Sequence, residues 1–168
     1  MKKIIWFLVI LLIILFVFLV GTGKLSNVLN KKSNEIEPVS QETISYDEYS
    51  RGNLIINGLT IPVIIANDTE KHIKGLSNRL LLPEDEGMFF VFEEPAEYMF
   101  WMKDMQFPLD IIWFSKDLEI IHLESNLPPE TYPDYFGPKK DSMYVLEVKA
   151  GFGTKNNLKI GDKAEFLP

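Results

Sequence analysis

The chain has 168 residues, with 17 basic and 24 acidic side chains, and its formal net charge is −7. This length suits one ordinary domain with a short extension. The acidic balance argues against nonspecific nucleic-acid binding, which depends on Lys and Arg side chains that neutralise phosphates. The absence of cysteine excludes disulfides, thiolate catalysis, iron–sulfur clusters and thiolate-bound zinc.

Residues 1–23 form a predicted membrane anchor. Residues 4–20 are an unbroken apolar run, preceded by Lys2 and Lys3. At about 1.5 Å per residue this run spans roughly 25 Å, and the uncharged residues 21–23 extend it towards the bilayer core of roughly 30 Å. The sequence therefore predicts a single-pass helix that contacts the membrane through residues 4–23. The alternative is a cleaved signal peptide, which would release the domain as a secreted protein.

The orientation of this segment follows from the charges that flank it. Lys2 and Lys3 precede the apolar run, whereas Lys24, Lys31 and Lys32 follow it, so the positive charges are nearly balanced. A short basic N-terminus before a first hydrophobic segment more often stays in the cytoplasm. We therefore expect a cell-membrane protein whose globular domain is extracytoplasmic.

Residues 24–52 are predicted to be a flexible tether. The segment is rich in Asn, Ser, Glu and Lys, contains Pro38 and lacks hydrophobic periodicity. Such a segment buries too little apolar surface to order itself. The alternative is an irregular arm that docks on the domain through Ile44, Tyr46 and Tyr49.

Residues 53–167 are predicted to form the globular domain. Two β-prone runs, residues 54–56 and 59–66, flank Asn57-Gly58, a pair typical of a two-residue hairpin turn. A short helix over residues 70–76 follows the cap candidates at residues 67–69. Turn residues then separate short apolar runs that predict further strands at residues 88–92, 98–102, 109–114, 118–123, 143–149 and 163–166, with a last helical turn within residues 151–158.

This order of elements predicts a mostly β (α+β) domain. Several short strands with one or two short helices are typical of a small, mostly antiparallel sheet that curls into a barrel or sandwich. A parallel βαβ fold would need more helices. The longest irregular loop, residues 125–141, contains four prolines, and loops of this kind are often functional.

A ligand site is predicted around the aromatic segment 98–114. Trp101 is its expected anchor, although aromatic residues at strand spacing are more often core residues. Asp110 would share a strand face with Ile112, which half-buries a carboxylate that needs a cation or backbone donors. Arg79 and Lys103 are the candidate cations. The alternative for Asp110 is a structural ion pair or a turn cap. The candidate ligand-binding residues are Arg79, Trp101, Lys103 and Asp110.

Acid–base chemistry would need two carboxyls, and Asp110 with Glu147 is the candidate catalytic pair. The alternative for Glu147 is an exposed strand residue. His72 and His122 lack the spacing of a known metal motif, and there is no GxGxxG or phosphate-loop pattern. The sequence therefore predicts no metal site and no cofactor.

Several short motifs, taken in chain order, resemble the signature of the uncharacterised DUF192 family, also called UPF0127. These motifs are Gly75-Leu76 with Arg79, Glu86-Gly87-Met88 before residues 89–92, residues 100–103, residues 108–111, residues 144–147, Ala150-Gly151 and Gly161-Asp162. The resemblance covers residues 53–166 and implies a mostly β domain, often behind a signal or membrane segment, with no established activity. Ser77 departs from it, because many relatives have Met after the Gly-Leu pair, and the 125–141 loop lacks the cysteine-containing segment of some relatives.

We expect a non-catalytic module that binds a small molecule or an envelope protein. Its predicted surface combines the aromatic region around Trp101 with an ion-pairing group of Arg79, Lys103 and Asp110. One alternative is an envelope hydrolase that uses paired carboxylates. Another is a structural spacer or assembly factor, which would show an exposed apolar patch but no sizeable pocket.

Overall fold

Residues 48–168 are the part of the chain that the computed structural model describes. The predicted anchor, residues 1–23, and tether residues 24–47 lie outside it. Within residues 48–168, no helix has the length and the apolar character that crossing a bilayer requires. The first strand begins at Arg51, three residues before the predicted run 54–56, and Tyr49 is already buried in the core.

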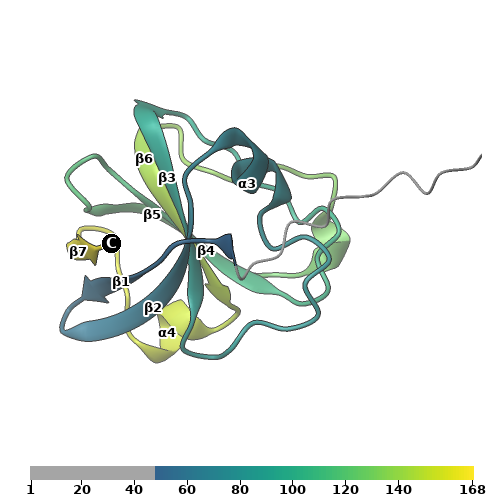
Figure 1. The fold of residues 1–168 in the computed structure, drawn as a ribbon, viewed down its shortest axis with the longest axis horizontal. Coiled ribbons are helices and arrows are strands. Elements are labelled where there is room, and N and C mark those ends of the chain that lie inside the picture. The colour runs from purple at the N-terminus through teal and green to yellow at the C-terminus, as the bar shows by residue number, and fades with distance from the viewer. Residues whose placement is uncertain (1–47) are drawn as a thin grey trace, which may run out of the picture. The chain divides into compact units, whose positions relative to one another are not determined.

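The described residues form a curled half-barrel sheet with two short helices (Figure 1). The strands lie in the order β5-β4-β6-β3-β2-β1-β7. Their bounds are β1 Arg51–Ile56, β2 Leu59–Ala66, β3 Gly87–Ala96, β4 Leu109–Phe114, β5 Ile120–Leu127, β6 Ser142–Lys149 and β7 Ala164–Leu167. The helices are α3 Thr69–Lys74 and α4 Phe152–Lys155, with a 3-10 turn at Pro129–Thr131. The predicted mostly β class is confirmed.

The β1–β2 hairpin has the predicted turn. Ile56 pairs with Leu59, and the two residues between them have positive φ angles, 52° at Asn57 and 82° at Gly58. This is the left-handed backbone that a tight hairpin turn demands and that Asn and Gly tolerate.

The β2–α3–β3 unit departs from a wholly antiparallel sheet. Residues 63–66 of β2 pair in parallel with residues 87–90 of β3, and α3 lies in the crossover between them. The side chain of Asp68 caps α3 by accepting a 2.9 Å hydrogen bond from the Lys71 N–H. The helix ends at Gly75, where φ is +45°. One βαβ crossover therefore interrupts the antiparallel pattern.

One predicted strand is absent, and another begins two residues later than predicted. Residues 98–102 form no strand and make only a single bridge, in which Phe100 and Phe136 exchange two 2.8 Å backbone hydrogen bonds. The rings of this segment pack over the sheet instead, where Phe100 contacts Trp113 edge to face. The strand predicted at residues 118–123 begins at Ile120, because Leu118 has a φ of +57° in the preceding turn.

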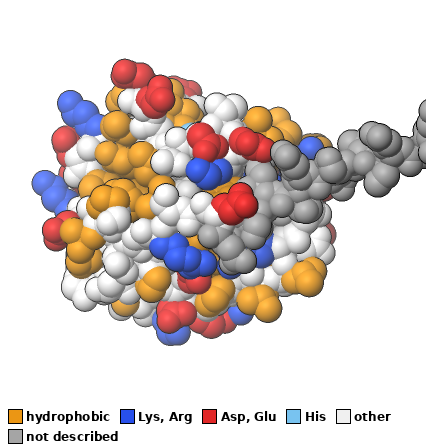
Figure 2. All heavy atoms as spheres, in the orientation of Figure 1, with side chains coloured by type: hydrophobic (Ala, Val, Ile, Leu, Met, Phe, Trp, Pro, Cys, Tyr) orange, Lys and Arg blue, Asp and Glu red, His pale blue; other side chains and the backbone are white. Residues whose placement is uncertain are grey.

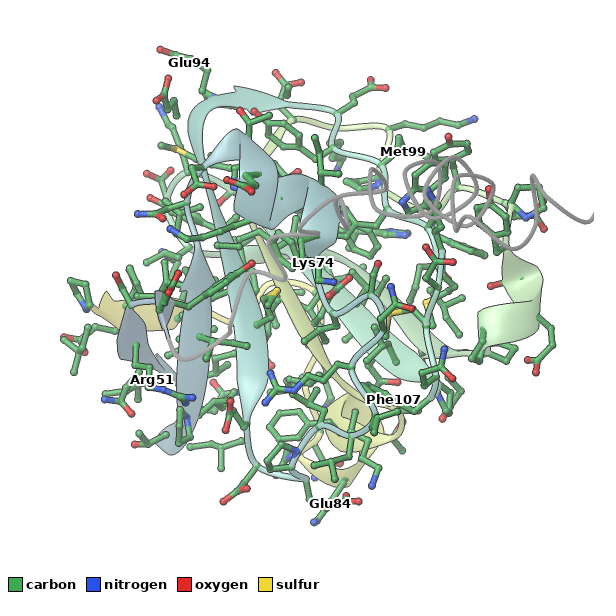
Figure 3. The ribbon with its side chains drawn as sticks, turned by 45° about the vertical axis from the view of Figure 1, so that its right-hand side comes forward. Arg51, Lys74, Glu84, Glu94, Met99 and Phe107 are labelled. Atoms are coloured by element: carbon green, nitrogen blue, oxygen red, sulfur yellow. The ribbon has the colours of Figure 1, made fainter. Side chains whose placement is uncertain are left out.

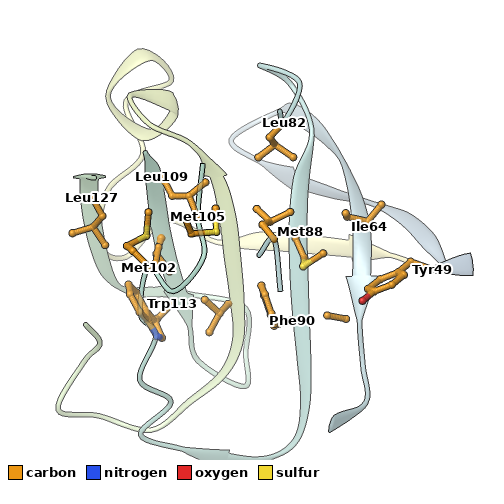
Figure 4. Packing of buried hydrophobic residues seen from close by; sticks show 14 residues of the cluster. Tyr49, Ile64, Leu82, Met88, Phe90, Met102, Met105, Leu109, Trp113 and Leu127 are labelled. Carbon is orange, nitrogen blue, oxygen red and sulfur yellow. The ribbon is translucent and has the colours of Figure 1, made fainter. Parts of the chain in front are cut away.

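The curled sheet separates two apolar cores. Strands β3, β4 and β6 alternate their side chains between them, so Phe90, Trp113 and Val145 enter one core while Phe89 and Leu146 enter the other. Figure 4 shows the core that contains Phe90 and Trp113, which we call the first core. Leu76, just after α3, also packs into the first core, so this core lies on the side of the sheet that carries the candidate site.

Candidate functional site

A cavity of about 360 Å³ lies beside the first core. Residues 69–77, which include α3, form one wall, and residues 98–105 form another. Lys74 and Met99, both labelled in Figure 3, line it from these two segments. Six aromatic residues line the cavity: Phe90, Phe92, Tyr98, Phe100, Trp101 and Tyr135. A volume of this size suits a small organic molecule.

The aromatic walls are held by ring–ring contacts. Phe92 stacks on Tyr98 with a centroid separation of 3.5 Å, and Phe90 meets Phe100 edge to face at 4.9 Å. These contacts tie β3 to the segment that crosses over it. Aromatic pairs in such geometries stabilise a fold beyond their area burial. The walls are therefore largely fixed before a ligand enters.

Glu147 contributes a carboxyl to the cavity. It lies on β6, between β4 and β3, where its neighbours across the strands are Ile111 and Met88. Only 5% of its surface is exposed, and its Oε2 atom has no hydrogen-bond partner among the residues that the structure describes. Burial raises the pKa of Glu147 to about 8, because a dry environment disfavours the charged form.

The expectation that Glu147 is an exposed strand residue is wrong. Its strand is central in the sheet, and the cavity side of that strand is covered by α3 and residues 98–105 rather than by solvent. A Cβ atom placed on Gly75 would lie 3.9 Å from Glu147 Oε2 and 3.6 Å from the Phe90 ring. Gly75 therefore brings the end of α3 close over the carboxyl.

Two basic side chains, those of Lys74 and Lys103, also line the cavity. The Lys103 Nζ atom lies 5.7 Å from the centre of the exposed Trp101 ring, a cation–π distance. Trp101 also stacks on Tyr135 at 5.1 Å. The exposed part of the lining is thus aromatic and basic at Trp101 and Lys103, whereas the carboxyl of Glu147 is buried.

His72 has a positioning role at the cavity wall. Its Nε2 atom lies 3.0 Å from the Ala66 carbonyl and 3.2 Å from the Val91 carbonyl. Because both neighbours are acceptors, Nε2 carries the hydrogen and donates. The ring also packs 4.3 Å from Phe92. His72 thereby attaches α3 to the end of β2 and the middle of β3.

Asp110 is a buried structural cap. Its Oδ1 accepts from the backbone N–H of Asn126 at 2.8 Å and of Gly151 at 3.0 Å, and its Oδ2 accepts from Gly153 at 2.8 Å. These donors satisfy the carboxylate without a cation. Neither of the predicted cations, Arg79 and Lys103, is among these donors, so the alternative of a capping aspartate describes the geometry.

The candidate catalytic pair is not assembled. Asp110 lies opposite Val148, and Ile111 lies opposite Glu147, on adjacent antiparallel strands. Because successive side chains leave opposite faces of a strand, Asp110 points to one face of the sheet and Glu147 to the other. The two carboxyls therefore cannot share a substrate as acid and base.

The predicted ion-pairing group is likewise divided. Arg79 Nε donates to the Leu81 carbonyl at 3.0 Å, and its guanidinium lies 3.6 Å from Glu86. Arg79 is not among the residues that line the cavity, whereas Trp101 and Lys103 are. The structure thus brings together two of the four predicted ligand-binding residues.

Several residues of the site were not predicted. Phe92 and Tyr135 lie outside the predicted aromatic segment 98–114, and Tyr135 belongs to the proline-rich loop that the sequence indicated as functional. That loop was the available signal, but no local pattern shows which of its side chains turns inward. Within residues 48–168, no group of three or more His, Asp or Glu side chains is placed to hold a metal ion.

The fold and the cavity define a class of protein: a mostly β half-barrel domain that carries an aromatic pocket with one buried acid. The chain belongs to the DUF192 family, described as an uncharacterized ACR, whose model matches residues 53–166. The resemblance seen in the sequence motifs is therefore confirmed. A search of curated proteins finds no match.

Two solved structures share this fold. A Sinorhizobium meliloti 1021 protein, provisionally described as a transcription regulator, has a TM-score of 0.66 and 28% identity, over 70% of this chain and 95% of that chain. A Novosphingobium aromaticivorans DSM 12444 protein of unknown function has a TM-score of 0.63 and 26% identity, over 70% of this chain and 84% of that chain.

Proposed function

We propose that this protein is a non-catalytic binding module, held at the outer face of a cell membrane by residues 4–23, whose cavity takes a small and largely apolar molecule. The observation that carries the proposal is the cavity of about 360 Å³, lined by six aromatic side chains and one buried carboxyl. Ligand sites typically combine apolar walls with a few placed polar groups. The membrane location is supported by the uninterrupted apolar run of residues 4–20.

Binding is favoured over hydrolysis by the arrangement of the acids. A hydrolase needs a nucleophile or a polarised water between correctly placed acid and base groups. Asp110 has its oxygens occupied by three backbone donors, and it lies on the opposite face of the sheet from Glu147. The cavity also favours binding over a spacer role, since a spacer needs no enclosed volume.

A small molecule is favoured over nucleic acid as the partner. The chain is acidic, with a net charge of −7, and phosphate binding depends on clustered basic residues. On the face that Figure 2 shows, basic and acidic side chains are interspersed rather than gathered in a basic stripe. The regulator description of the Sinorhizobium protein therefore does not lead us to propose a nucleic-acid partner.

The experiment is saturation-transfer NMR on the full chain in lipid nanodiscs, with 2-phenylethanol and indole as probes and empty nanodiscs as the reference. Both probes should receive saturation from the protein. Trp101→Ala should weaken the signal, whereas Leu80→Ala should not, because Leu80 is 85% exposed and does not line the cavity. No transfer above empty nanodiscs, or equal loss in both variants, would refute the proposal.

A further inference from the structure

Glu147 gives the cavity a polar anchor. Among the described titratable residues that line the cavity, it alone is buried, and its Oε2 atom lacks a partner among residues 48–168. A buried acceptor without a partner is costly and uncommon in native proteins. A ligand that brings a hydrogen-bond donor to this oxygen would remove the cost.

The walls around the carboxyl favour a positively charged donor. A Cβ atom on Gly75 would lie 3.9 Å from Glu147 Oε2 and 3.6 Å from the Phe90 ring. The ring and the carboxyl therefore border the same small volume. Aromatic faces carry negative potential and attract cations. Phe92 and Tyr98 continue this surface as a stacked pair.

We infer that the cavity selects organic ammonium ions, an inference that rests on the proposed function. The ligand would have a protonated primary amine that donates to Glu147, and an apolar body that packs on the aromatic walls. The cation forms a charge-assisted hydrogen bond with the carboxylate inside a dry site, where such bonds are strongest. The apolar part of the ligand would cover aromatic rings that are already held in place by ring–ring contacts.

The other titratable groups that line the cavity oppose the binding of a cation only weakly. Lys103 is exposed and lies over Trp101, so solvent and salt screen its charge, and Lys74 is half-buried, so part of its surface remains in contact with solvent. His72 has its Nε2 engaged with backbone carbonyls, and the Tyr98 hydroxyl donates to the Glu94 carbonyl at 2.7 Å. Tyr135 supplies a ring stacked on Trp101.

The inference carries a pH signature. Because burial raises the pKa of Glu147 to about 8, the free site is mainly neutral at lower pH, and binding an ammonium ion releases the carboxyl proton. Affinity for the cation should then fall about tenfold for each pH unit below 8. A neutral ligand of the same shape should show no such dependence.

The test is isothermal titration of the full chain in nanodiscs with three probes of similar shape: 2-phenylethylamine, 2-phenylethanol and 3-phenylpropanoate. At pH 8 the amine should bind about tenfold tighter than the alcohol, and at pH 6 this preference should be lost, because the affinity for the amine falls with pH while that for the alcohol does not. Glu147→Gln should abolish the amine preference while leaving alcohol binding intact, which also shows that the variant folds. Lys103→Met should keep the preference.

The outcomes separate this inference from the proposed function. If the alcohol binds as tightly as the amine, or if Glu147→Gln keeps the amine preference, the cation inference is overturned and the binding function stands. If the propanoate binds best and Lys103→Met weakens it, the site is selective for anions and the inference is also overturned. If none of the three probes binds the wild type, the proposed function itself fails.

Discussion

Asp110 and Glu147 are buried carboxyls on adjacent strands, and Asp110 pairs with Val148, the residue after Glu147. Their hydrogen bonding is opposite. Asp110 accepts three backbone hydrogen bonds, whereas Glu147 Oε2 has no partner among residues 48–168. The first arrangement stabilises the fold around α4. The second places an unsatisfied acid beside an aromatic cavity, where the proposed ligand would meet it.

Glu147→Gln should change how stability depends on pH. The carboxyl has a pKa of about 8 in the folded state against 4.5 for its ordinary value, so between these pH values the folded state holds a proton that the unfolded state has lost. The wild-type free energy of unfolding should therefore fall, relative to the variant, by about 1.4 kcal/mol per pH unit as the pH rises from 5 to 8.

Urea denaturation of wild type and Glu147→Gln at pH 5 and pH 8 measures this difference. Glu93→Gln is the matched control, because Glu93 is an exposed strand residue and its variant should follow the wild type. A gap between Glu147→Gln and wild type that is the same at both pH values would show that Glu147 is already ionised in the folded protein.

Asp110→Asn should destabilise the fold by about 2–4 kcal/mol. The carboxylate accepts from three backbone N–H groups through two oxygens, whereas an amide has one acceptor oxygen, and its NH₂ group would face N–H donors. Chemical denaturation measures the loss. Asp162→Asn is the control: Asp162 accepts a 2.8 Å bond from Lys159 N–H at an exposed position and should cost less than about 1 kcal/mol. Equal losses would contradict the cap assigned to Asp110.

Trp101→Ala and Trp113→Ala should separate binding from folding. Trp113 is fully buried and donates to the Tyr98 carbonyl at 2.8 Å, so its removal should cost about 3–5 kcal/mol. Trp101 lines the cavity and is 39% exposed, so its removal should cost less than about 1 kcal/mol while weakening the binding of 2-phenylethanol. Thermal unfolding and titration measure the two effects. A large stability loss in Trp101→Ala would make Trp101 a core residue.

Fusions after Pro168 test the predicted topology. Because residues 1–23 are expected to form an anchor with its N-terminus in the cytoplasm, an alkaline phosphatase fusion should be active and a green fluorescent protein fusion should be dark. A shift in mass corresponding to loss of the N-terminal residues would indicate a cleaved signal peptide instead. Fluorescence with inactive phosphatase would place the domain in the cytoplasm.

Local sequence determined the elements whose signals are local. Asn57-Gly58 between two β-prone runs fixed the first hairpin, Asp68 fixed the start of α3, and the order of short motifs identified the family. These features depend on turn chemistry, capping and residue spacing, which act over a few residues. The mostly β class followed from the same signals.

Only the tertiary structure decided the site. Alternation along β6 shows that Val145 and Glu147 share a face, but it cannot show that residues 98–105 and the end of α3 cover that face. The strand order β4-β6-β3 joins segments far apart in the chain, and it set Asp110 and Glu147 on opposite faces. Burial depends on such long-range packing, so the carboxyl that looked exposed in the sequence became the buried acid of the cavity.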